Sequence, residues 1–330
     1  MSPEVVSTQA YINGQSCYNT DIDRDLMPNK HLEHPEDSIL FGRRHALRTV
    51  RDLIKSNKLS VKWDGAPAIV FGINPSNGQF FVGTKSVFNK RRPKINYSPE
   101  DIDKNHKGTV ADILRLCFRH LPRYHRIIQC DWIGVGGGSV YQPNTIAYHF
   151  PDPVYSKIIV APHTEYTELS PTAEAKIGVT LNSSDECYMV DTNNAEVIPP
   201  LSWNNLLRIL PTVLLSKTPK SRIEIQKHIN SFIRQGEVPH PQELYSLLDA
   251  KYKYEVNVYT FKAWHLISQL KHRLLDAIVV NGDVECYIDG EPTNHEGFVT
   301  VSENPYKIVD RLTFSKANFN LDKNWKHEKV

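Results

Sequence analysis

The sequence predicts an α+β protein, in which antiparallel β-sheets are flanked by helices and interrupted by a helical insertion. Three observations support this class. A hydrophobic fraction of 40%, with 10% aromatic residues, is ample for a buried core. Short strand-like segments occur both before residue 201 and after residue 278. Between them, residues 203–275 have the apolar spacing of helices, so the helical block divides a β-rich body.

The first elements follow from a change in apolar period near residue 58. A helix is predicted over residues 36–57, because Ala46, Val50 and Leu53 fall on one helical face. The loop at residues 74–78 ends in an Asn-Gly pair, which favours a hairpin between the strands around it. The strands predicted in this region are residues 60–63, 68–73 and 79–84.

A second helix and three further strands are predicted before residue 163. Thr109, with Asp112 three residues later, is typical of a helix start, and Pro122 ends that helix. The glycine-rich residues 134–139 lack the Gly-Lys-Ser/Thr ending of a phosphate-binding loop, so a turn is expected there. The predicted strands are residues 126–133, 145–150 and 157–162.

The remaining elements give a division of the chain into four parts. Helices are predicted at residues 203–215, 221–234 and 241–275, the last in one or two pieces. Strands follow at residues 284–288, 297–301 and 306–309, with an Asp-Gly turn between the first two. The predicted parts are an N-terminal extension (1–35), a core in two segments (36–200 and 279–330) and the helical insertion (201–278).

The net charge of +2 conceals a strong segregation of charge along the chain. Residues 41–130 carry 18 basic and 6 acidic side chains, a net of +12, whereas residues 131–200 carry 2 and 9, a net of −7. Apolar runs are too short to span a bilayer, and no secretory signal is visible. The five cysteines are scattered without zinc-site spacing, which favours a reduced, cytoplasmic location.

Four short motifs place reactive side chains at the ends of predicted strands. They are Lys62-Trp-Asp-Gly65, Gln129-Cys-Asp131, His295-Glu-Gly-Phe-Val299 and the segment beginning Tyr306-Lys307. Burial and neighbouring positive charge would both favour the free amine of Lys62, which is the nucleophilic form. The alternative for the first motif is a surface lysine before an Asp-Gly turn. His163 and Thr164 follow a strand and could point into the same cleft.

This series resembles the covalent nucleotidyltransferase superfamily, which comprises ATP-dependent DNA and RNA ligases and mRNA-capping enzymes. The resemblance spans residues 60–320 and is most specific at Lys62-Trp-Asp-Gly65 and Glu296-Gly-Phe-Val299. It implies a ligase-type adenylation domain in which Lys62 takes up AMP from ATP. Val309 stands where the family has a second basic residue, and Arg311 or Lys316 is the expected substitute.

The resemblance also implies a role for each site residue. Glu296 would orient Lys62 or hold a metal, and Lys307 with Mg²⁺ (or Mn²⁺) would neutralise phosphate charge. Asp131 would bind the ribose and contribute to the metal site. Tyr148 would stack on the adenine, unless it is simply a core aromatic residue. The residues implied in ATP binding are Asp64, Gly65, Lys85, Asp131, Tyr148 and Arg311.

A dense cationic run suggests the second substrate. Lys90, Arg91, Arg92 and Lys94 lie among no acidic residues and would contact a phosphate backbone, unless they form a solvated loop. Too few residues follow Arg311 for an OB-fold domain, which favours RNA over DNA. The predicted function is therefore an ATP-dependent polynucleotide ligase joining 5′-phosphate to 3′-hydroxyl ends, with no membrane partner. The alternatives are a DNA ligase, an adenylyltransferase with another acceptor, and an inactive nucleic-acid-binding relative.

Overall fold

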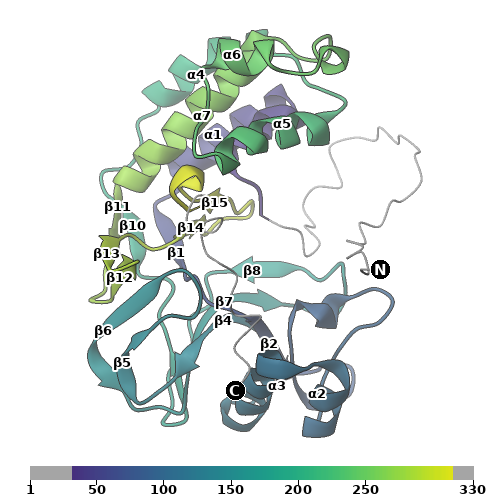
Figure 1. Ribbon diagram of the computed structural model, residues 1–330, viewed down its shortest axis with the longest axis vertical. Coiled ribbons are helices and arrows are strands. Elements are labelled where there is room, and N and C mark those ends of the chain that lie inside the picture. The colour runs from purple at the N-terminus through teal and green to yellow at the C-terminus, as the bar shows by residue number, and fades with distance from the viewer. Residues whose placement is uncertain (1–31, 315–330) are drawn as a thin grey trace, which may run out of the picture.

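Three β-sheets and two groups of helices make up residues 32–314, the part of the chain that the computed structural model describes. Helices gather at one end of the molecule and the sheets at the other, with a smaller helical pair below the sheets (Figure 1). The predicted α+β class is therefore confirmed. Most of the predicted N-terminal extension and the alternative basic residue Lys316 lie outside the described residues.

The first sheet joins segments from both ends of the chain, in the order β11-β10-β1-β14-β15. Strand β1 pairs antiparallel with β14, and Lys62 lies opposite Gly297. Strand β14 pairs in turn with β15, which places Lys307 opposite Val299. The strands are β1 (Lys58–Lys62), β10 (Ala195–Val197), β11 (Ile278–Val280), β14 (Gly297–Thr300) and β15 (Lys307–Ile308).

The second sheet has the order β3-β2-β4-β7-β8, and β9 adds a parallel pairing to β7. The predicted hairpin at residues 74–78 is confirmed, since β2 and β3 pair across it. One face packs on α2 (Pro99–Asn105) and α3 (Gly108–His120), and the other on η2 (Lys85–Phe88). The strands are β2 (Ala68–Ile73), β3 (Phe80–Gly83), β4 (Ile127–Val135), β7 (Ile158–Tyr166), β8 (Ala175–Ile177) and β9 (Cys187–Met189).

The third sheet, β13-β12-β6-β5, projects from one side of the molecule (Figure 1). The glycine-rich segment before it is less of a turn than predicted, because β4 runs on to Val135 and β5 begins at Gly138. Gly137, with φ near 116°, takes a conformation that favours glycine. The strands are β5 (Gly138–Tyr141), β6 (Ala147–Val154), β12 (Glu285–Ile288) and β13 (Glu291–Thr293).

The helical layer contains more of the chain than the predicted insertion. Gly42, with φ near 129°, breaks the predicted helix at residues 36–57 into η1 (Pro35–Phe41) and α1 (Arg43–Lys55). Both pack against the inserted helices: η1 meets α5 and α7, and α1 meets α4 and α7. No helix among residues 32–314 is long and apolar enough to cross a bilayer. The inserted elements are α4 (Asn204–Leu215), α5 (Arg222–Arg234), α6 (Pro241–Ser246), η3 (Ala250–Tyr252) and α7 (Val258–Asp276).

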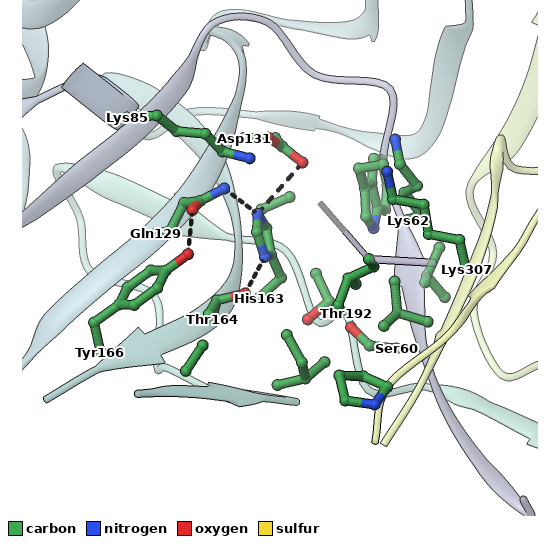
Figure 2. Close-up of a pocket in the computed structure, with 18 of the residues that line it drawn as sticks. Ser60, Lys62, Lys85, Gln129, Asp131, His163, Thr164, Tyr166, Thr192 and Lys307 are labelled. Atoms are coloured by element: carbon green, nitrogen blue, oxygen red, sulfur yellow. Dashed lines mark hydrogen bonds and ion pairs between the residues drawn. The ribbon is translucent and has the colours of Figure 1, made fainter. Parts of the chain in front are cut away.

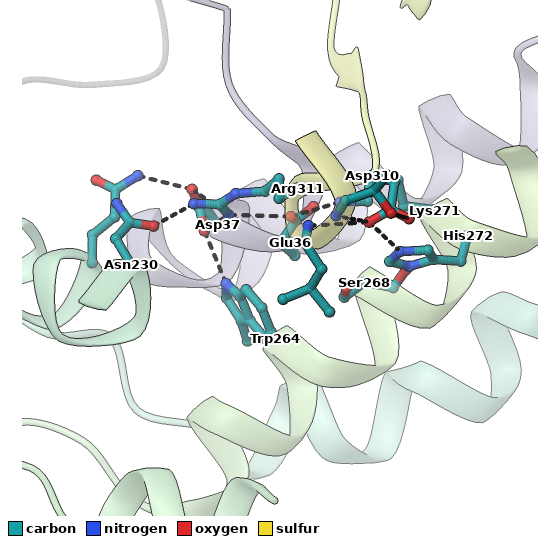
Figure 3. Close-up of polar contacts among 12 residues, drawn as sticks. Glu36, Asp37, Asn230, Trp264, Ser268, Lys271, His272, Asp310 and Arg311 are labelled. Atoms are coloured by element: carbon teal, nitrogen blue, oxygen red, sulfur yellow. Dashed lines mark hydrogen bonds and ion pairs between the residues drawn. The ribbon is translucent and has the colours of Figure 1, made fainter. Parts of the chain in front are cut away.

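A buried ionic network ties this layer to the segment that follows β15 (Figure 3). Lys271 of α7 donates to Glu36 of η1 at 2.8 Å, and only 1% of either side chain is exposed. Arg311 reaches both Glu36 and Asp37 at 3.2 Å. Burial alone would raise the pKa of Glu36, but the charges of Lys271 and Arg311 outweigh burial and lower it. The network is stable only when each buried charge has its partner.

We expect Lys271→Met to lower the free energy of unfolding by about 3 kcal/mol, because Glu36 then loses one of its two cationic partners. The matched control is Lys262→Met on the exposed face of the same helix, which should have little effect. The double variant with Glu36→Gln should recover part of the loss. Urea denaturation measures the unfolding free energy of all three variants. Equal losses for Lys262→Met and Lys271→Met would contradict a stabilising role for the buried ion pair.

Candidate functional site

A cavity of about 470 Å³ opens between the first and second sheets (Figure 2). This volume falls within the roughly 300–1,000 Å³ that is common for small-molecule sites. One wall comes from β1, β14 and β15, and the opposite wall from β4 and β7. The lining residues that carry polar or charged groups include Ser60, Lys62, Lys85, Gln129, Asp131, His163, Thr164, Tyr166, Thr192 and Lys307.

The register of β1 with β14 brings Lys62 and Glu296 together. Lys62 ends β1 opposite Gly297, and Glu296 is the residue immediately before Gly297. The ammonium of Lys62 donates to the carboxylate of Glu296, although the two are far apart in the sequence. Burial raises the pKa of Glu296, and the charge of Lys62 opposes that rise. The predicted pair is therefore in direct contact, with the lysine amine at the cavity wall.

Three lysines from separate segments line the same cavity: Lys62, Lys85 and Lys307. Lys85 lies in η2, whose start is capped by the side chain of Thr84. Burial lowers the pKa of Lys307, and the positive charges of Lys62 and Lys85 lower it further. Asp131, Glu174 and Glu303 also line the cavity, so its charge is mixed. An anion placed between the lysines would relieve their mutual repulsion.

The opposite wall carries hydrogen-bonding groups on β4 and β7, as Figure 2 shows. The hydroxyl of Tyr166 donates to Gln129 Oε1 at 2.8 Å, and Gln129 Nε2 lies 3.4 Å from His163 Nε2. His163 Nδ1 is 2.6 Å from Thr164 Oγ1, and His163 Nε2 is 3.6 Å from Asp131 Oδ2. Asp131 thus lies where the sequence predicted it, on the wall that faces Lys62 and Lys307.

Asp64 and Gly65 do not line the cavity and shape the turn after Lys62 instead. The buried carboxylate of Asp64 accepts from the backbone N–H groups of Thr145 and Ile146 at 2.8 and 3.0 Å. A Cβ atom at Gly65 would lie 2.6 Å from the carbonyl oxygen of Trp132. Both residues therefore dock this turn on its neighbours, and neither lines the cavity to which the sequence analysis assigned them.

Tyr148 and Arg311 are also placed away from the cavity. Tyr148 is fully buried, its ring packs on Trp63 with centroids 4.4 Å apart, and its hydroxyl accepts from the N–H of Asp64 at 2.6 Å. No face of its ring is exposed for an adenine, so the core-aromatic interpretation holds. Arg311 is held by Glu36 and Asp37 in the ionic network, and its charge is already neutralised there.

The cationic run lies in the loop that follows η2 and Lys85. Lys90, Arg91, Arg92 and Lys94 are exposed, and Lys94 donates to the carbonyl oxygen of Asn105 at 2.9 Å. None of the four lines the cavity.

A β-bulge explains why the sequence could not place the β7 residues. Gln129 pairs with Thr164, but Cys130 pairs with Pro162, so His163 is an extra residue in the ladder. His163 and Thr164 both line the cavity as a result, whereas strict alternation would send them to opposite faces. Tyr166 and Thr192 were not singled out in the sequence, and no local pattern marks them.

Of the two carboxylates predicted as metal ligands, Asp131 lines the cavity, and Glu296 contacts Lys62, which also lines it. Among residues 32–314, no group of three or more His, Cys, Asp or Glu side chains is arranged to hold a metal ion. Mg²⁺ is commonly held by one or two carboxylates together with substrate phosphates and water. Asp131 on the cavity wall would therefore hold a metal ion only together with the phosphates of a ligand.

Comparison with known families places the chain in one of them. A family model described as "Family of unknown function (DUF6267)" matches residues 29–323, nearly the whole chain, and the protein belongs to this family. No curated protein and no solved structure matches the chain.

The close approach at Gly65 gives a direct test of the turn. Gly65→Ala would place a methyl group 2.6 Å from Trp132 O and 2.7 Å from Asp131 Cβ. We expect a loss of about 1–3 kcal/mol in the free energy of unfolding. Gly138→Ala is the matched control, because nothing lies within 4 Å of the position that its Cβ would take. Equal stability of both variants in urea denaturation would contradict the packing described for Gly65.

His295, next to Glu296, should make stability depend on pH. Burial lowers its pKa from 6.5 to about 4, so below pH 6.5 the unfolded chain binds a proton that the folded chain does not. Stability is then lost as the pH falls from 6.5 through 4, by roughly 3 kcal/mol for this group.

We expect His295→Phe to remove this contribution while keeping an aromatic ring against Trp63. Between pH 7 and pH 4 the unfolding free energy of the variant should therefore fall less steeply than that of the unmodified protein. His125→Phe, at an exposed position, controls for the loss of an imidazole. Parallel pH profiles for the His295 variant and the unmodified protein would refute the prediction.

Proposed function

We propose that the protein is an ATP-dependent nucleotidyltransferase that forms a lysyl-adenylate at Lys62, and that its acceptor is a polynucleotide. One observation carries the proposal: Lys62, Lys85, Asp131 and Lys307, from four separate segments, line one cavity, and Lys62 also contacts Glu296. The four residues are those that the resemblance to ligases and capping enzymes selected. On this proposal the sheets correspond to a ligase-type adenylation domain.

The first step requires the free amine of Lys62. Its nitrogen attacks the α-phosphorus of ATP, a P–N bond forms, and the bond to the bridging oxygen breaks with release of pyrophosphate. The amine loses one proton, and the carboxylate of Glu296 is the acceptor in contact with it. Burial raises the pKa of Glu296, which makes its carboxylate a better acceptor than an exposed one.

Negative charge on the non-bridging oxygens must be balanced as the P–N bond forms. Lys307 and Lys85 line the cavity with Lys62 and would bind the phosphates. Mg²⁺ held by Asp131 or Glu296 together with the phosphates would supply further electrophilic stabilisation. Asp131, on the opposite wall, is placed to accept hydrogen bonds from the ribose.

The exposed cationic loop favours a nucleic acid as acceptor. Lys90, Arg91, Arg92 and Lys94 follow Lys85 in the chain, are exposed, and would contact successive phosphates. A 5′-phosphate oxygen would attack the adenylyl phosphorus and release Lys62, and a 3′-hydroxyl would then displace AMP to seal the strand. RNA is the preferred acceptor in this proposal.

Covalent labelling tests the first step. Incubation with ATP labelled at the α-phosphate and Mg²⁺ or Mn²⁺ should leave label on the denatured chain, and Lys62→Ala should reduce it to background. Lys58→Ala, at the exposed start of the same strand, should label as the unmodified protein does. If the chain carries no label with either Mg²⁺ or Mn²⁺, the enzymatic proposal is refuted.

The acceptor requires a separate experiment. GTP in place of ATP determines the base, and single strands or nicked duplexes with 5′-phosphate ends determine the acceptor. Neutralising Lys90, Arg91 and Arg92 should weaken binding to RNA and reduce its salt dependence without reducing lysyl-adenylate formation. Label on Lys62 with no transfer to any polynucleotide would instead favour a different acceptor.

A further inference from the structure

Two hydrogen-bond acceptors lie side by side on the wall that faces Lys62 and Lys307 (Figure 2). They are Asp131 Oδ2 and His163 Nε2, 3.6 Å apart. This distance is too long for a good hydrogen bond between them. About one fifth of each side chain is exposed, 17% for Asp131 and 24% for His163, and both line the cavity. Each is therefore accessible to a donor on a bound ligand.

The partners of His163 determine which of its nitrogens accepts. Gln129 Oε1 accepts from Tyr166, so the amide Nε2 of Gln129 faces His163 Nε2. An amide N–H can only donate, and we therefore assign the imidazole proton to Nδ1, which lies 2.6 Å from Thr164 Oγ1. A proton on Nε2 would instead oppose the N–H of Gln129. In this network His163 Nε2 is an acceptor.

Neither acceptor is well satisfied by the protein. The contact from Gln129 to His163 is 3.4 Å, longer than the usual N–H donor distance of about 2.9–3.0 Å. Within residues 32–314, no hydrogen bond to the carboxylate of Asp131 is found, and His163 at 3.6 Å is its ion-pair partner only when protonated. A ligand with two adjacent hydroxyl groups would supply one donor to each.

We propose that His163 and Asp131 together bind the two adjacent hydroxyl groups of the ribose, and that His163 is a specificity-determining residue for ribonucleotides. The inference rests on the function proposed above and adds a residue to its nucleotide site. One hydroxyl donates to Asp131 and the other to His163 Nε2. The β-bulge at His163 is what brings its ring to the cavity beside Asp131. A deoxynucleotide would leave one of the two acceptors without a donor, which disfavours its binding.

Equilibrium binding tests this without requiring chemistry. In a Lys62→Ala background, calorimetry compares ATP, 2′-deoxyATP and 3′-deoxyATP. We expect ATP to bind roughly tenfold more tightly than at least one deoxy analogue, and His163→Ala to abolish that preference. His163→Gln, which can present an amide oxygen near the Nε2 position, should restore part of it. His149→Ala, a histidine change on β6 that does not line the cavity, should retain the full preference.

The outcomes separate this inference from the proposed function. Parallel labelling of the chain with an intact Lys62 shows whether ATP reacts. If ATP binds and labels Lys62 but His163→Ala keeps the same preference as the parent, or no preference exists, the ribose-reading role is wrong and the proposed function stands. If ATP neither binds nor labels, both are overturned.

Discussion

The pairing of β1 with β14 is the constraint on which the candidate site depends. It places Lys62 beside Glu296, residues separated by 234 positions in the chain. The next pairing, of β14 with β15, adds Lys307 to the same wall. Because register in a sheet has a period of two residues, a slip of one position would turn Lys62 away from the cavity. The helical insertion lies between the paired strands in sequence but not in the sheet.

Both walls of the cavity carry charged groups, and Lys85 lies on the side of Asp131, away from Lys62 and Lys307 (Figure 2). The first wall and η2 supply three lysines, and burial together with their mutual repulsion lowers the pKa of Lys307. The second wall supplies Asp131 and the His163 network. An anion bound to the lysines and hydroxyl groups bound to the second wall would satisfy both at once. A nucleotide carries both kinds of group, because its phosphates and its ribose hydroxyls belong to one molecule.

The ionic network connects this site to the helical layer. Lys307 lines the cavity, and four residues later Arg311 is fixed by Glu36 and Asp37. Lys271 of α7 binds the same Glu36. The short segment after β15 is therefore held at both ends, by β14 on one side and by the helices on the other. Its position does not depend on strand pairing alone, which for two residues is weak.

The sequence by itself determined the elements with strong local patterns and the residues of the first wall. The apolar period predicted the α+β class and strand 68–73, and the motifs identified Lys62, Glu296 and Lys307 because strand-end spacing is local information. It assigned Asp64, Tyr148 and Arg311 to the nucleotide site, but none of them lines the cavity, and their partners come from distant segments. Only the tertiary structure decided that Tyr148 is core, that Arg311 is neutralised by buried carboxylates, and that a bulge turns His163 toward Asp131. The surroundings of these three residues depend on which distant segments pack together. Residue type and spacing along one strand do not specify that packing.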